Sequence, residues 1–155
     1  MTKVGHCNMA SREAVTNRLD AGGVEKLIDR RFPQIHSGGR NLVIEEVTPS
    51  ITRVRLRADP RNTRPGGTVS GPAMFTLADF SVYVALIARL GEAGVDAVTT
   101  NLNISFLAKP EAGDMTAVVR LLRVGRRLAV GEAEMFASTG SDLVAHAIAT
   151  YTVPS

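Results

Sequence analysis

One segment, residues 72–88, constrains the fold more than any other part of the chain. It reads PAMFTLADFSVYVALIA and is apolar on every side, with Ser70 and Gly71 ahead of it and a proline suited to the first turn of a helix. A helix that is apolar all round belongs inside a protein. The segment is shorter than the roughly 20 apolar residues that span a bilayer, and it carries an acid in its middle, so we expect a core helix and no membrane span.

The rest of the chain predicts strands and one further helical region. Residues 41–48 and 51–58 are β-branched and are expected to pair as a hairpin, whereas residues 59–67, with two prolines and two glycines, are expected to form a loop. Four more strands are predicted at residues 97–108, 115–124, 128–138 and 143–153, with breaks of hairpin length between them. An antiparallel sheet with one fully apolar helix to cover it should wrap around that helix, so we predict an α+β fold.

Residues 13–32 show apolar spacings near three and four, which predict an amphipathic helix pair broken at Gly22 and Gly23. We therefore divide the chain into an N-terminal helical extension, residues 1–40, and a single sheet-and-helix domain, residues 41–155. A chain of 155 residues leaves little room for a second core.

Composition excludes several partners. The net charge of +3 is a common solubility feature, and with only 5% aromatic residues the chain lacks stacking platforms, so we expect no nucleic-acid partner. The single cysteine, Cys7, cannot form an intrachain disulfide, and the first ten residues lack a secretion signal, so we expect a cytoplasmic protein. His6, His36 and His146 are scattered without metal-ligand spacing, so we assign no metal and no cofactor.

Asp79 is the one charged residue in the apolar segment. Burying an unpaired carboxylate costs several kcal/mol, so Asp79 must have a partner, be held protonated, or face a cleft. The alternative is that the helix begins at Asp79, which would then be its N-cap.

The glycine-rich residues 66–71 lack the lysine of a P-loop and do not follow a strand directly, so we expect no nucleoside triphosphate. They do offer a helix N-terminus whose free amides, led by that of Gly71, could stabilise an oxyanion. A plain glycine-rich helix start would explain the same residues.

Four short segments carry a family resemblance: GTVSG at 67–71, LAD at 77–79, NLNISFL at 101–107 and VGRRLA at 124–129. Together they resemble the PaaI-like (phenylacetyl-CoA thioesterase type) hotdog-fold acyl-CoA thioesterases, over residues 41 to 153. The resemblance implies an antiparallel sheet wrapped around one long helix, and hydrolysis of a CoA thioester. It assigns the general base or nucleophile to Asp79, the carbonyl-polarising amide to Gly71 and an assisting hydroxyl to Thr99.

The chain departs from the family pattern at the start of the helix. The family usually has His-Gly-Gly where this chain has Ser70, Gly71 and Pro72, and an asparagine where it has Arg64, with Asn62 two positions away. We keep Arg64, Ser70 and Asn62 as substrate-binding candidates. Because of these departures, a non-catalytic acyl-CoA-binding protein is the alternative function.

Geometry predicts that any such site needs two copies of the chain. Gly71 and Asp79 lie eight residues apart, roughly 12 Å along one helix, and cannot flank the same carbonyl carbon. We therefore expect a homodimer with two equivalent sites, which could pair into a dimer of dimers. Arg126, Arg127 and Lys109 are candidates for the phosphates of coenzyme A, although a solvated turn would also explain the two arginines.

Overall fold

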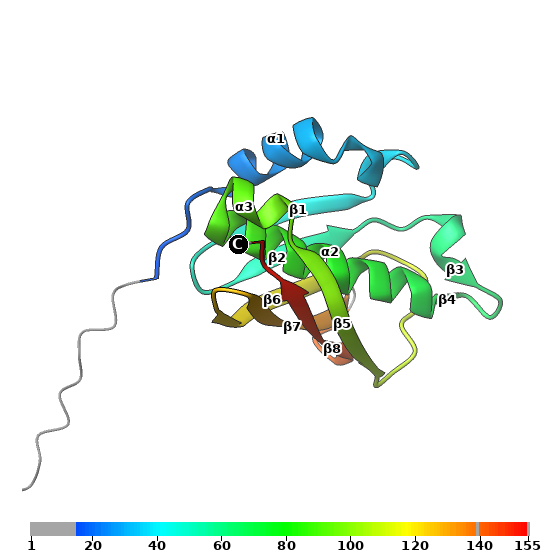
Figure 1. The fold of residues 1–155 in the computed structure, drawn as a ribbon. Coiled ribbons are helices and arrows are strands. Elements are labelled where there is room, and N and C mark those ends of the chain that lie inside the picture. Colours follow the sequence, from blue (N-terminus) through cyan, green and yellow to red (C-terminus); the bar gives the residue numbers. More distant parts are fainter. Residues whose placement is uncertain (1–14, 139, 155) are drawn as a thin grey trace, which may run out of the picture.

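The computed structural model describes residues 15–138 and 140–154 (Figure 1). Cys7, His6 and the predicted start of the N-terminal helix at residues 13 and 14 lie outside this range. The element order is one helix, two strands, a short hairpin, a long helix and four strands, with short helical turns between some of them.

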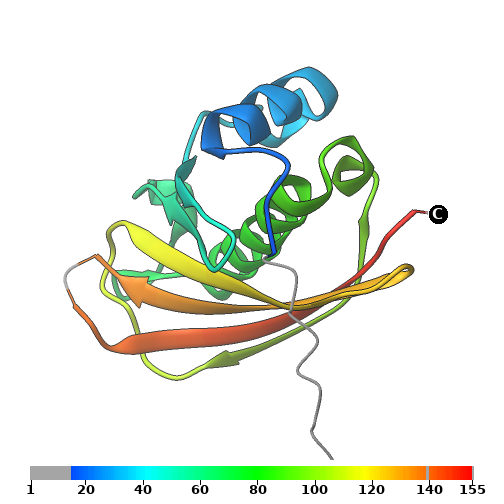
Figure 2. The same ribbon diagram turned by 90° about the vertical axis from the view of Figure 1, so that its left-hand side faces the viewer.

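Six strands form one sheet in the order β1-β2-β6-β7-β8-β5, and every neighbouring pair is antiparallel. Their bounds are Leu42–Val47 (β1), Thr52–Leu56 (β2), Val98–Phe106 (β5), Met115–Val124 (β6), Leu128–Ala137 (β7) and Leu143–Thr152 (β8). The sheet curves beneath one long helix, α2 (Gly71–Leu90), as Figure 2 shows. The predicted α+β arrangement of an antiparallel sheet around a buried helix is confirmed.

Helix α2 is the centre of the core. Thirteen of its 20 residues are buried, and alternate residues of the strands, such as Val54, Met115, Ala133 and Ala145, pack beneath it. The helix is longer than the sequence segment suggested, and an 18-residue stretch of its 20 residues has a mean hydropathy of 1.6, which meets the length and composition of a membrane span. In this fold 67% of that stretch is buried against the rest of the protein, as in the core helix of a folded domain.

Ser70 is the N-cap of α2, because its side chain accepts a hydrogen bond from the Ala73 amide at 3.3 Å. Asp79 therefore lies two turns inside the helix, and the alternative that it caps a helix start is wrong. Gly91, with a φ of +67°, ends the helix.

Between residues 15 and 40, the described part of the N-terminal region contains one α-helix, α1 (Ala21–Arg31), followed by the short 3-10 turn η1 (Pro33–His36). The predicted break at Gly22 and Gly23 is wrong. Both glycines lie in the first turn, where the Asp20 side chain accepts a hydrogen bond from the Gly23 amide at 2.8 Å and starts the helix. The buried face of α1 packs against α2, β1 and the short helix α3 (Glu92–Val95).

Residues 59–67 are also more regular than predicted. They contain the 3-10 turn η2 (Pro60–Asn62) and the strand β3 (Thr63–Arg64), which pairs with β4 (Thr68–Val69). Gly66 and Gly67 adopt φ values of +101° and +75°, which only glycine tolerates readily, and so close a tight hairpin. The loop is therefore a compact hairpin that leads directly into α2.

Candidate active site

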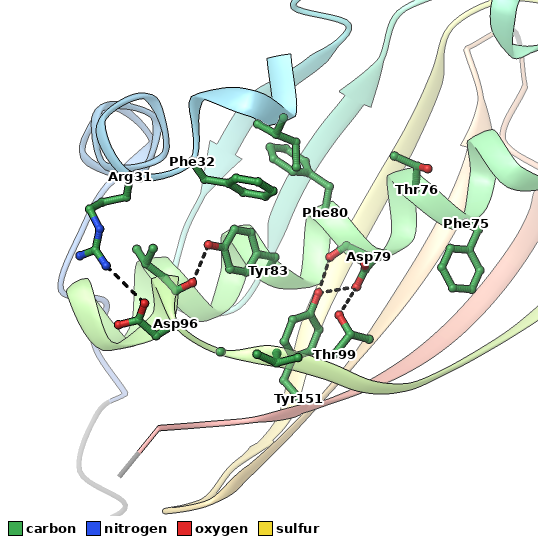
Figure 3. Close-up of a pocket in the computed structure, with 14 residues that line it drawn as sticks. Arg31, Phe32, Phe75, Thr76, Asp79, Phe80, Tyr83, Asp96, Thr99 and Tyr151 are labelled. Atoms are coloured by element: carbon green, nitrogen blue, oxygen red, sulfur yellow. Dashed lines mark hydrogen bonds and ion pairs between the residues drawn. The ribbon is translucent and has the colours of Figure 1, made fainter. Parts of the chain in front are cut away.

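A cavity of about 530 Å³ lies beside the middle of α2, between the C-terminal end of α1, the start of β5 and the end of β8 (Figure 3). Its polar lining comprises Arg31, Thr76, Asp79, Asp96 and Thr99. Asp79 is the one acidic residue of α2, so it is the acid that this helix contributes to the cavity. The predicted helix acid therefore faces a cavity.

Two hydroxyl groups bind the same oxygen of the Asp79 carboxylate. Thr99 Oγ1 donates to Asp79 Oδ1 at 2.7 Å, and the Tyr151 hydroxyl, which also lies 2.8 Å from the Asp79 backbone oxygen, makes a short hydrogen bond to the same Oδ1. Asp79 Oδ2 has no hydrogen-bond partner among the described residues. The carboxylate is thus held at one oxygen and is open at the other.

Tyr151 is suited to remain a hydrogen-bond donor. The residue is 2% exposed, and burial, followed by the nearby Asp79 charge, raises the pKa of its hydroxyl far above the usual value. Tyr151 therefore stays protonated across the neutral range. It can fix Asp79 without exchanging protons with it.

Aromatic rings form much of the cavity wall. The chain has five phenylalanines and two tyrosines, and five of these seven line the cavity: Phe32, Phe75, Phe80, Tyr83 and Tyr151. Tyr83 stacks on Tyr151 with ring centroids 6.4 Å apart, and its hydroxyl donates to the Val95 backbone oxygen at 2.8 Å. The cavity therefore combines one open carboxylate oxygen with a largely apolar surround.

The amino end of α2 offers one free amide. Ala73 donates to Ser70 Oγ, Met74 donates to Ser70 O at 3.2 Å, and Pro72 has no N–H. Gly71 is therefore the residue of the first turn whose amide has no acceptor within the ranges that the structure describes. The Phe106 ring lies 3.4 Å from where a Cβ on Gly71 would be, which puts this amide beside the end of β5.

The other predicted substrate-binding residues lie at two opposite ends of the molecule. Ser70 donates its amide to Asn62 O at 2.7 Å, Arg64 lies on β3, and Lys109 precedes Pro110, whose oxygen accepts from Val69. These four residues surround the start of α2. Arg126 and Arg127 lie on the turn between β6 and β7, where the Arg127 oxygen accepts from Val153 near the Asp79 end of β8.

Phe75 and Tyr83 line the cavity, whereas Met74 is buried in the core and Phe106 lies beside Gly71. Sequence reasoning missed Tyr151, Phe32 and Arg31. Tyr151 carried a usable signal, because a tyrosine on the inward side of a predicted strand needs a partner for its hydroxyl. No group of three or more possible metal ligands occurs in the described part of the chain.

Comparisons with known proteins agree with this geometry. A family model described as the thioesterase superfamily matches residues 66–144. A provisionally named thioesterase from a Silicibacter species is 38% identical, with a TM-score of 0.81, and the alignment covers 92% of this chain and 97% of that one. The chain therefore belongs to the thioesterase superfamily and has its hotdog fold.

Two more distant relatives add context. A Saccharolobus solfataricus protein, provisionally named an esterase, is 28% identical over 109 residues, which cover 70% of this chain and 71% of that protein. A variant of the phenylacetic acid degradation protein PaaI from Thermus thermophilus is 20% identical, with a TM-score of 0.66 over 79% of this chain and 99% of that one, and shows the shared fold. The family match, the Silicibacter structure and the Saccharolobus relative together support thioester hydrolysis as the general chemistry.

Proposed function

We propose that the protein hydrolyses acyl-coenzyme A thioesters to a free acid and coenzyme A, with Asp79 as the catalytic carboxylate. The observation that carries this proposal is the asymmetry of that carboxylate. Thr99 and Tyr151 hold Oδ1, and Oδ2 has no partner among the described residues. A reacting group must be positioned and yet retain a free lone pair, and Asp79 meets both conditions.

Two routes use this oxygen. As a general base, Oδ2 takes a proton from a water molecule while that water attacks the thioester carbon, and coenzyme A leaves as the thiol after the proton is returned. As a nucleophile, Oδ2 attacks the carbon itself, expels the thiolate and forms an anhydride that water then hydrolyses. Thr99 and Tyr151 keep the aspartate in place in both routes.

The thioester oxygen needs a donor on the other side of the carbonyl. The Gly71 amide is the candidate, because it is free and lies at the positive end of the α2 dipole. It lies about 12 Å from Asp79 along the same helix, too far to reach the same carbonyl. The site therefore requires Gly71 from a second copy of the chain.

Strand β5 provides the geometry for that second copy. It is an edge strand, paired with β8 on one side, and Val98 and Phe106 near its two ends are 61% and 52% exposed. Asp79 bonds to Thr99 at the start of β5, whereas Gly71 lies against the ring of Phe106 at the end of β5. Thr99 and Phe106 themselves are about 23 Å apart along the strand. Antiparallel pairing of two β5 strands about a two-fold axis would place each Gly71 beside the other copy's Asp79.

The same two-fold axis would also bring the basic residues together. Arg126 and Arg127 lie at the Asp79 end of the sheet, and Lys109 and Arg64 lie at the Gly71 end. In the proposed dimer, Arg126 and Arg127 of one copy lie on the same side as Lys109 and Arg64 of the other copy. Together these four residues would bind the phosphates of coenzyme A. Ser70 and Asn62 would support the amide that faces the carbonyl.

The test is a thiol-release assay on short-chain, medium-chain and aryl acyl-CoA esters, with wild-type protein and Asp79→Asn. The proposal predicts turnover of at least one ester by the wild-type protein and its loss in the variant. Turnover that survives in Asp79→Asn would remove Asp79 from the mechanism. Calorimetric binding of the esters without thiol release by the wild-type protein would instead select a non-catalytic acyl-CoA-binding protein.

A further inference from the structure

The N-terminal segment supplies one end of the cavity that holds Asp79. Arg31, Phe32 and Ile35 come from the end of α1 and from η1, and all three line the cavity. They lie more than 40 positions before Asp79 in the sequence. The segment is therefore part of the site and not an appendage to the core.

Phe32 occupies the position where α1 ends and the chain turns into η1. Its ring meets Tyr83 edge to face, with centroids 6.3 Å apart, and 37% of the residue is exposed. Figure 3 shows the order along α2: Asp79, then Tyr83, then Phe32 above it, with the Arg31 and Asp96 pair beyond. Phe32 thus closes the cavity on the side away from the amino end of α2.

Ion pairs hold this end wall on the rest of the protein. Arg31 donates to Glu92 at 2.7 Å and to Asp96 at 3.2 Å, and Arg30 also pairs with Glu92. Glu92 lies on α3, and Asp96 ends it just before β5 begins. The buried side chains of Val24, Leu27 and Ile28 attach α1 to the core, whereas the ion pairs of Arg30 and Arg31 fix the position of its last turn.

We propose that Phe32, held in place by the contacts of Arg31 with Glu92 and Asp96, determines the longest acyl chain that the site accepts. This inference rests on the proposed thioesterase function. The thioester carbon must lie beside Asp79 Oδ2, and coenzyme A must leave toward the opening that the second copy completes. The acyl group then extends along α2 past Tyr83 and ends against the Phe32 ring.

The chemistry of this end of the cavity favours an apolar acyl group. Phe80, Tyr83 and Phe32 present rings, and the charges of Arg31 and Asp96 neutralise each other beyond them. An apolar chain that is too long would have to displace a packed ring or break the ion pairs. The wall therefore acts as a length limit, with no direct role in bond cleavage.

The experiment measures kcat/KM over a series of straight-chain acyl-CoA esters of increasing length, for wild-type protein and Phe32→Ala. The inference predicts that the longest chain accepted increases and that the ratio of long-chain to short-chain kcat/KM rises about tenfold or more, because methylene-sized changes in apolar pockets have effects of this order. Phe136→Ala is the matched control, since that ring lies on β7 outside the cavity lining, and its length profile should equal that of the wild type.

Two further measurements keep the outcome decisive. If Phe32→Ala does not fold, Phe32→Leu and Asp96→Asn test the wall and the ion pair separately, and both should broaden the length profile. Calorimetry with non-hydrolysable thioether analogues of the same lengths tests the wall even if no ester is cleaved, whereas absence of thiol release with the wild-type protein overturns the proposed function alone. An unchanged length profile in folded Phe32 variants, by both turnover and binding, would overturn the inference.

Discussion

Asp59 and Asp79 are two aspartates of one chain with opposite surroundings. Asp59, in the turn that leads toward α2, accepts bonds at both oxygens: Oδ1 from the Arg61 amide at 2.8 Å and Nε at 3.1 Å, Oδ2 from Arg61 Nη2 at 2.8 Å and the Asn41 amide group at 3.0 Å. Asp79 accepts bonds from two hydroxyl groups at one oxygen, and no cationic side chain in the described part of the chain bonds to it. The first carboxylate is saturated, and the second is half free.

In the proposed mechanism, this difference separates a structural acid, Asp59, from a reactive one, Asp79. Hydrogen bonds from Arg61, first from its side chain and then from its backbone, hold the pKa of Asp59 well below its usual range, so that group stays ionised and unreactive. Asp79 is fixed by neutral donors, which position it while leaving one oxygen available for substrate or water. A free oxygen that faces a cavity, more than burial alone, marks the acid with a chemical role.

The strongest way to break this comparison is to replace each aspartate by its isosteric amide. Asp79→Asn removes the proposed base or nucleophile and should lower kcat by roughly 100-fold or more, while the circular dichroism spectrum stays native. Asp59→Asn is the matched control and should keep kcat within about twofold, because Asp59 contacts Arg61 and Asn41 and does not line the cavity that holds Asp79. Equal losses in the two variants would show that the carboxylates do not differ in role.

Removal of one donor from Asp79 sharpens the comparison. Tyr151→Phe keeps the buried ring but takes away the hydroxyl bond, and should lower kcat roughly tenfold with little change in KM, the size expected for one hydrogen bond to a charged group. Thr99→Val should act in the same direction, and Thr99→Ser should restore most of the rate. A change confined to KM would place these hydroxyls in substrate binding instead.

The arginines offer a parallel contrast. Arg61 is committed to Asp59, whereas Arg126 and Arg127 have no ion-pair partner within the described ranges. Arg126→Ala combined with Arg127→Ala should raise KM for an acyl-CoA several-fold and leave kcat nearly unchanged, since the lost contacts are to phosphates remote from the reaction. Added salt should weaken substrate binding by the wild type more than by the double variant.

Acid titration tests the structural half of the comparison. Because the folded-state pKa of Asp59 is depressed, its ionised form stabilises the fold above the unfolded-state value near 3.8, and that contribution is lost as the pH falls below it. The free energy of unfolding of Asp59→Asn should therefore approach that of the wild type as the pH decreases from 5 toward 2. A difference between the two proteins that stays constant over this interval would contradict the assigned cause.

The main elements of the fold were predictable because local signals agree with the tertiary structure. The uninterrupted apolar run around Asp79 predicted α2, and the glycine-rich breaks predicted β6 with its observed bounds, Met115–Val124. Two signals misled. Gly22 and Gly23 predict a break, but the Asp20 cap starts the helix just before them. The prolines near residue 60 predict an irregular loop, but Gly66 and Gly67 close a hairpin there.

The site was less predictable because its contacts are distant in sequence. Asp79 is recognisable from the sequence, because it is the one acid in an apolar helix. Tyr151 lies 72 residues further along the chain and reaches Asp79 only because β8 packs beneath α2. Phe32 belongs to the cavity because α1 folds back over the helix, which no local pattern specifies. The catalytic and substrate-binding roles of the residues chosen from the sequence stay predictions.

The most direct measurement mixes two inactive proteins. Asp79→Asn lacks the carboxylate. Gly71→Val places a branched side chain against Phe106, where it should block the approach of the thioester carbonyl to the amide of residue 71. After co-refolding in equal amounts, half of the dimers are mixed and each has one intact site, so thiol-release activity should recover to about a quarter of the wild-type value. No recovery in mixed dimers of confirmed composition would show that Asp79 and Gly71 do not meet across two copies, and would contradict the shared site.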